Sequence, residues 1–224
     1  MYTSTARLSE VRLEAGVAII GGAAIGNEAC QMATLIGREV ILAGRSLLTG
    51  GRGGAGEHAS LGAAAACTEL GIAAEARIFA LVPRDERAEF RVGTCVEAGS
   101  SWLERRIMLI RHSVGAIVVG GGEGTADEVR IAVLRAIMEG YSIIPASGTG
   151  GVADRICRAI GPFEEAVLNH RRPSGEKARR LVEKVLSGCW YCDIDPVVAH
   201  EQWFFGENRD PTAIRMAHIR HTYF

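Results

Sequence analysis

Hydrophobic positions along the chain form short apolar runs, separated by longer segments in which apolar residues recur at helical spacing. The runs are rich in β-branched residues, and glycine or proline lies at or soon after the end of each. They occupy residues 17–26 (including the turn that follows), 46–51, 76–83, 114–120 and 141–147. Because nearly every position in them is apolar, these runs are typical of parallel strands covered by helices on both faces.

The segments between these strands predict helices. Residues 27–43 carry apolar side chains at helical spacing, namely Ala29, Ala33, Ile36, Val40 and Ile41. We therefore favour a helix ending near Gly44, although "REVILAG" within it also reads as a strand. Further helices are predicted over 56–71, 100–113, 125–140, 151–161 and 176–187. Residues 84–99 are predicted to be irregular, with a short strand near Phe90.

Strands that alternate with helices predict an α/β fold: an open, mostly parallel, Rossmann-like sheet with helices on both faces. At 224 residues we expect one globular unit. Its nucleotide-binding domain would span 1–161, and 162–224 would add a helix and an irregular extension packed on the same domain. The aromatic residues of the last segment are too apolar for a solvated tail.

Composition narrows the range of partners. The formal net charge is −1, which gives no electrostatic reason to expect nucleic acid or a membrane surface. No apolar stretch approaches the roughly 20 residues that span a bilayer, and the first ten residues do not resemble a signal peptide. The 6 cysteines are spread along the chain. We therefore expect a cytoplasmic protein with buried thiols.

The chain contains 28 glycines, which cluster at 50–56 and 120–124. Each cluster lies where a strand gives way to a helix, and a helix N-terminus attracts phosphate. Glycine allows the backbone to approach an anion closely. The candidate phosphate- or nucleotide-binding residues are Gly21, Gly22, Gly50, Gly51, Gly53, Gly54, Gly121, Gly122, Gly124 and Thr125. The alternative is that both clusters form tight turns only.

Two common nucleotide motifs do not fit. The P-loop pattern GxxxxGK[ST] is missing, because no lysine stands where it is needed. Neither loop shows GxGxxG with an acidic residue at the end of the next strand, which disfavours a dinucleotide-dependent dehydrogenase. We expect a nucleotide-like small molecule as the ligand, without a cofactor.

Arg105 and Glu128 are the candidate catalytic pair. The predicted helix 100–113 runs antiparallel to the strand that follows, which returns its first turns to the level of Gly121 and Gly122. Glu128 lies in the first turns after the same glycines. An arginine and a carboxylate beside a phosphate loop suit action on the anomeric bond of a sugar phosphate. Alternatively, Glu128 could close a capping box with Thr125, and Arg105 could be a surface residue.

These residues resemble the LONELY GUY (LOG) group, formerly labelled "possible lysine decarboxylase". "ERRIMLIRHSVGAIVVGGGEGTADE" (104–128) is similar, without gaps between Arg105 and Glu128, to the group's arginine helix followed by PGGxGTxxE. "TGGRGGAGEHASLGA" (49–63) is closer to the first glycine motif of the molybdenum-cofactor-carrier-like branch. The resemblance covers roughly 17–160.

The resemblance implies a Rossmann-like homodimer. In the enzymes of the group, the N-glycosidic bond of a nucleoside 5′-monophosphate is hydrolysed to free base and ribose 5-phosphate. Arg105 and Glu128 would be catalytic, and the glycines with Thr125 would bind phosphate. The alternative is a non-catalytic sensor or carrier of a nucleotide-like ligand or of the molybdenum cofactor.

The chain departs from the LOG pattern near the second loop. Gly120 stands where the enzymes have proline, and Glu123 adds a charge that would repel phosphate unless it points away.

Other signals are weaker. Cys189 and Cys192, with histidines at 200, 218 and 221, have ligand-type side chains but irregular spacing, so no metal site is expected. Glu57 and His58 open the helix after the first glycine cluster and either contact the ligand or cap the helix. The arginines at 171, 172, 179 and 180 are expected on a solvated helix face.

Overall fold

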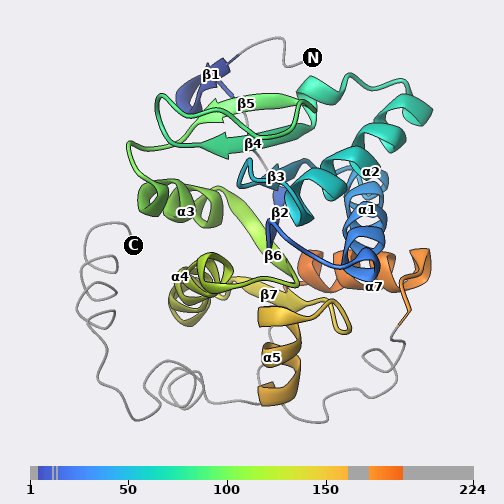
Figure 1. The fold of residues 1–224 in the computed structure, drawn as a ribbon. Helices are drawn as coiled ribbons and strands as arrows, with labels where there is room; N and C mark the ends of the chain where they lie inside the picture. Colours follow the sequence, from blue (N-terminus) through green and yellow to red (C-terminus); the bar gives the residue numbers. More distant parts are fainter. Residues whose placement is uncertain (1–4, 12, 14, 161–171, 189–224) are drawn as a thin grey trace.

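The computed structural model describes residues 5–11, 13, 15–160 and 172–188, and these form an α/β structure around one parallel sheet (Figure 1). The strands are β1 Thr5–Arg7, β2 Gly16–Gly21, β3 Leu47–Thr49, β4 Ile78–Val82, β5 Thr94–Glu97, β6 Ser113–Val119 and β7 Ser142–Pro145. The helices are α1 Asn27–Leu42, α2 Ala55–Leu70, α3 Trp102–Arg111, α4 Glu123–Glu139, α5 Gly151–Ile160 and α7 Gly175–Leu186. Short 3-10 turns lie at Leu8–Glu10 and Ala74–Ala76.

The sheet has the strand order β1-β5-β4-β3-β2-β6-β7, and every pair in it is parallel. From β2 the chain moves outward through β3, β4 and β5. It then returns to the other side of β2 to form β6 and continues away to β7. The direction of winding thus reverses between β2 and β6. Ligands of open α/β sheets bind at such a reversal, beyond the carboxyl ends of the strands.

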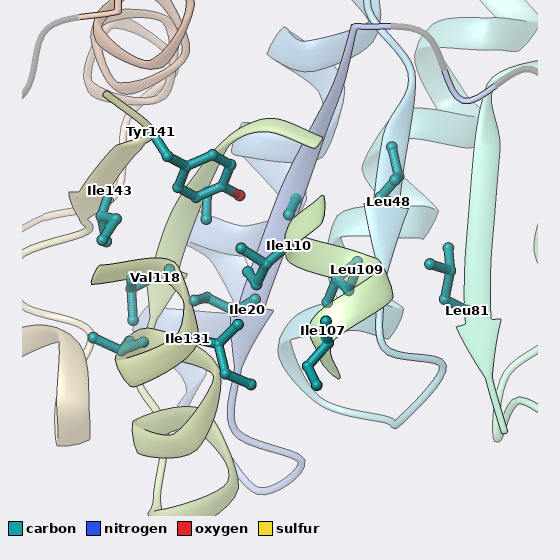
Figure 2. Packing of buried hydrophobic residues seen from close by; sticks show 14 of the residues in the cluster. Ile20, Leu48, Leu81, Ile107, Leu109, Ile110, Val118, Ile131, Tyr141 and Ile143 are labelled. Carbon is teal, nitrogen blue, oxygen red and sulfur yellow. The ribbon is translucent and has the colours of Figure 1, made fainter. Parts of the chain in front are cut away.

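Successive residues of each strand enter opposite halves of the core, as the alternation of a strand requires. Ala18 and Ile20 of β2 pack with α3, α4 and α5, whereas Val17 and Ile19 pack with α1, α2 and α7 (Figure 1). Figure 2 shows the first half, where side chains of α3 and α4 lie against strand residues such as Ile20. This two-sided burial confirms the expected fold class and explains why inner strands such as β2 and β4 carry no polar side chain.

Helices α1 and α2 touch through their backbones. A Cβ on Gly37 of α1 would lie 1.9 Å from the carbonyl oxygen of Ala59, and one on Gly62 of α2 would lie 1.9 Å from that of Thr34. Neither glycine accepts a side chain without moving a helix. We call this contact the α1–α2 glycine seam.

The structure differs from the sequence predictions in local details. Phe90 is buried in a loop, and the short strand of this region is instead Thr94–Glu97, paired between β4 and β1. The edge strand β1 is not expected from the sequence. Helix α4 begins at Glu123, two residues before the predicted start at Thr125. The helical interpretation of 27–43 is confirmed, with Gly44 in a left-handed conformation just beyond the helix. In the described part of the chain, no helix is both long and apolar enough to cross a bilayer.

Candidate nucleotide site

A cleft of about 540 Å³ opens at the carboxyl ends of β2, β3 and β6, where the sheet reverses its winding. Its lining residues are Ile19, Gly21, Gly22, Ala23, Ala24, Gly50, Arg52, Gly53, Gly56, Trp102, Arg105, Arg106, Gly122, Gly124, Thr125 and Glu128. Seven of the ten predicted phosphate-binding residues are in this set, and so are both predicted catalytic residues. The volume lies within the range of small-molecule sites, roughly 300–1,000 Å³.

The other three predicted residues, Gly51, Gly54 and Gly121, do not line the cleft but shape its walls. Their φ angles are +71°, +64° and +106°, a region that favours glycine. A Cβ on Gly54 would lie 2.3 Å from the carbonyl oxygen of Gly22. The loops after β2 and β3 are therefore held backbone against backbone. The two glycine clusters converge at one edge of the sheet.

Helices α2, α3 and α4 begin at the cleft, and glycine caps the N-termini of α2 and α4. Gly54 caps α2 and Gly122 caps α4, and neither has a side chain to accept the first amide hydrogens. By contrast, α3 and α7 are capped by the hydroxyls of Ser101 and Ser174. An anion beside Gly54 or Gly122 could accept the hydrogen bonds that a serine would otherwise accept.

The Arg105 guanidinium and the Glu128 carboxylate meet at the cleft, with Nη1 donating to Oε1 at 2.6 Å. The two residues are only 4% and 6% exposed. Arg105 also lies over the ring of Trp102, 5.3 Å from its centroid, while its buried Nε has no hydrogen-bond partner within the described residues. This pair is protected from solvent on a wall that a ligand would touch.

The alternative roles of these two residues do not fit. Arg105 is buried rather than on the surface, unlike the partly exposed Arg106. Thr125 lies inside α4, whose N-cap is Gly122, so Thr125 and Glu128 form no capping box. Glu123 is exposed and does not line the cleft. Its charge therefore does not face the space a phosphate would enter.

Arg52, Trp102 and Arg106 also line the cleft with large side chains, and the sequence analysis does not single them out. Arg52 pairs with Glu89 at 2.8 Å, and its guanidinium carbon lies 5.0 Å from the centroid of Trp102. Arg106 pairs with Asp127 at 3.0 Å. Helical spacing could have pointed to Trp102, because residues three positions apart lie on the same face of a helix and Arg105 is already a candidate. Arg52 depends on a long-range contact with Glu89, which spacing does not reveal.

The loop after β7 and the start of α5 hold the second glycine cluster in place through hydrogen bonds. Thr149 accepts a hydrogen bond from the Gly120 amide at 2.9 Å, and the first amides of α5 donate to the carbonyls of Gly120 and Gly121. Gly120 has a φ of +59°, which proline cannot adopt, and its amide hydrogen is in use. The backbone at position 120 therefore does not accept the proline that the LOG enzymes have there.

Lys177 of α7 secures this supporting loop. Its buried Nζ donates to the Ser147 carbonyl oxygen at 2.6 Å. Burial lowers the pKa of Lys177 below its ordinary value, and nearby Cys157, Asp154 and Glu28 act in the opposite direction. Helix α7 thus contributes to the site although it lies beyond the region of LOG resemblance.

The remaining candidates lie elsewhere. Glu57 and His58 are on the first turn of α2 and do not line the cleft. Arg172 is exposed, and Arg179 and Arg180 are exposed on α7 beside Glu183 and Glu176. Arg171, the Cys189–Cys192 pair, the histidines at 200, 218 and 221 and the aromatic C-terminal segment fall outside the described residues.

Comparisons with known proteins agree with this architecture. The structure is similar to that of TM1055, a structural-genomics target, with a TM-score of 0.59 and 24% identity, covering 76% of this chain and 99% of that chain. It is also similar to a molybdenum cofactor binding protein from the phototrophic bacterium Rippkaea orientalis, with a TM-score of 0.55, 21% identity and coverages of 77% and 97%. The Moco carrier protein from Chlamydomonas reinhardtii gives 0.55, 22%, 78% and 99%. At these identities the likeness establishes the fold alone.

The sequence comparisons are more specific. Among curated proteins no match is found. The model of the SLOG cluster4 family, however, matches residues 14–159, which contain both glycine clusters and the Arg105–Glu128 pair. The chain therefore belongs to the SLOG cluster4 family, within the LOG-like superfamily of Rossmann-like nucleotide-binding folds.

Proposed function

We propose that this protein hydrolyses the N-glycosidic bond of a nucleoside 5′-monophosphate, giving the free base and ribose 5-phosphate. The observation that carries the proposal is the buried Arg105–Glu128 pair, held at 2.6 Å on the wall of a cleft with two glycine-capped helix N-termini. A structural ion pair would not need to line a cavity.

The phosphate would bind at the start of α4. There Gly122 and Gly124 bring the backbone to the cleft, Thr125 adds a hydroxyl, and the helix dipole favours an anion. Arg106 lies close by, because a Cβ on Gly124 would be 3.1 Å from its Nη2. This placement leaves the sugar near Glu128, which is one turn further along the same helix.

Glu128 would act at the anomeric carbon. As the bond to the base breaks, positive charge develops on the ribose ring, and a nearby carboxylate stabilises that charge or positions the attacking water. Water adds its hydroxyl to the anomeric carbon, and its proton balances the departing base. Arg105 orients the carboxylate and offsets its charge, so that it repels the substrate phosphate less.

The test is a panel of AMP, GMP, CMP, UMP and an N6-substituted AMP incubated with the purified full-length chain. We expect at least one member to yield base and ribose 5-phosphate in equal amounts. No turnover of any member would overturn the hydrolase proposal. The resemblance also supports a homodimer, which light scattering would test on the same preparation.

A second candidate is a non-catalytic carrier of a nucleotide-like ligand or of the molybdenum cofactor. The backbone of Gly120 favours it, because its φ of +59° excludes the proline found in the hydrolases. Two of the proteins with similar folds are described as molybdenum cofactor binding or carrier proteins. Tight binding of one ligand without turnover would support this second function.

A further inference from the structure

We propose that Trp102 is the platform on which the base of the nucleotide stacks, and that Arg52 is the group the base displaces from the ring. This inference rests on the proposed function and adds how the base is held. Its ligand class is a nucleotide with a flat aromatic heterocycle.

Trp102 is the one aromatic residue among the cleft-lining residues of the described chain. It opens α3, three residues before Arg105, whose guanidinium carbon lies 5.3 Å from its ring centroid. A base on this ring would therefore lie beside the Arg105–Glu128 pair, which is where the bond between base and sugar has to be. With the phosphate at α4, the indole is the flat aromatic surface available to the base.

Arg52 is held far more weakly than Arg105. Its side chain is 55% exposed, compared with 4% for Arg105, and its partner Glu89 is also largely exposed. Exposed ion pairs contribute little to stability. Its guanidinium carbon nevertheless lies 5.0 Å from the Trp102 centroid, so it occupies the ring that a base would use. A stacked base offers comparable contact with the ring.

The surroundings leave room for a planar group. Apart from Arg52 itself, the loops after β2 and β3 and the start of α2 contribute only small residues to the lining, namely Gly22, Ala23, Ala24, Gly50, Gly53 and Gly56. Because these positions lack bulky side chains, the displaced guanidinium can move without a rearrangement of the backbone.

The experiment measures calorimetric dissociation constants for AMP, GMP, CMP and UMP, with ribose 5-phosphate as the ligand without a base. All variants are made in a Glu128→Gln background, so that turnover does not consume the nucleotides. Trp102→Ala should weaken binding of the nucleotides at least about fivefold and that of ribose 5-phosphate less than about twofold. Trp102→Phe should retain most of the affinity, because it keeps a flat ring.

Arg52→Ala provides a prediction of opposite sign. Loss of the Arg52 charge weakens the binding of both the nucleotides and ribose 5-phosphate. Removal of the guanidinium from the Trp102 ring, however, favours only the nucleotides, because only they carry a base. The ratio of nucleotide affinity to ribose 5-phosphate affinity should therefore rise in Arg52→Ala and fall in Trp102→Ala. Nucleotide binding should also quench the fluorescence of Trp102, and this quenching should be missing in Trp102→Phe.

The outcomes separate the two proposals. If Trp102→Ala weakens nucleotides and ribose 5-phosphate by the same factor, or weakens neither, the inference is overturned while the proposed function stands. If none of the four nucleotides binds, and the N6-substituted AMP does not bind either, the proposed function fails and this inference fails with it.

Discussion

Gly50 at the end of β3 and Arg105 of α3 are in direct contact: a Cβ on Gly50 would lie 2.5 Å from Nη1 of Arg105. The guanidinium lies against bare backbone and reaches Glu128 from there. The first glycine cluster therefore does more than present bare backbone to the cleft. It provides the space in which the arginine of the candidate pair is positioned.

Gly50→Ala should reduce formation of ribose 5-phosphate by about tenfold to a hundredfold, because the added methyl displaces the Arg105 guanidinium from Glu128. The rate of product formation measures this effect. Gly175→Ala is the control, since a Cβ there meets nothing within 4 Å. Equal rates in the two variants would mean that the contact has no part in positioning Arg105.

Glu128→Gln should lower the turnover rate about a hundredfold or more while nucleotide binding persists, because the amide lacks the charge that stabilises the sugar cation. Glu139→Gln is a matched control: Glu139 also lies on α4 and pairs with an arginine, Arg135, at 2.9 Å, but it is exposed and outside the cleft. Circular dichroism would establish that both variants are folded. Turnover that survives Glu128→Gln would remove the carboxylate from the mechanism.

Much of this arrangement follows from local sequence, and the rest depends on long-range contacts. Arg105 and Glu128 could be placed together because a helix and an antiparallel strand of known lengths return the chain to the same edge. The three-residue strand β1 carries no comparable pattern, and Phe90 looks like a strand residue because burial in a loop also requires an apolar side chain. The position of the Arg52 side chain depends on its ion pair with Glu89, 37 positions away, and periodicity in the sequence cannot detect such a contact.

Gly120→Pro should destabilise the fold by about 3 kcal/mol or more, because proline can neither adopt the observed φ nor donate to Thr149. Gly120→Ala keeps the amide hydrogen and should cost about 1–2 kcal/mol for its left-handed backbone. Urea unfolding of the two variants would measure the difference. If the proline variant were as stable as the wild type, the loop would have to adopt the conformation of the LOG enzymes.

Lys177→Met should change how stability depends on alkaline pH. Burial lowers the pKa of Lys177 in the folded chain, so between that value and the unfolded value of about 10.5 the unfolded chain binds more protons. The wild type should therefore gain free energy of unfolding relative to Lys177→Met as the pH rises from about 8 to about 10. Urea unfolding at both pH values measures this difference, and a constant or shrinking difference would contradict the assignment.

The α1–α2 glycine seam fixes helix α2, whose Gly56 lines the cleft, firmly against α1. Helices joined through backbone atoms cannot slide to suit a new ligand, because no side chain lies between them to repack. The opposite side, formed by α3, meets the cleft through the side chains of Trp102, Arg105 and Arg106. Attempts to re-engineer the ligand selectivity of the cleft should therefore begin at Trp102 and Arg106 of α3.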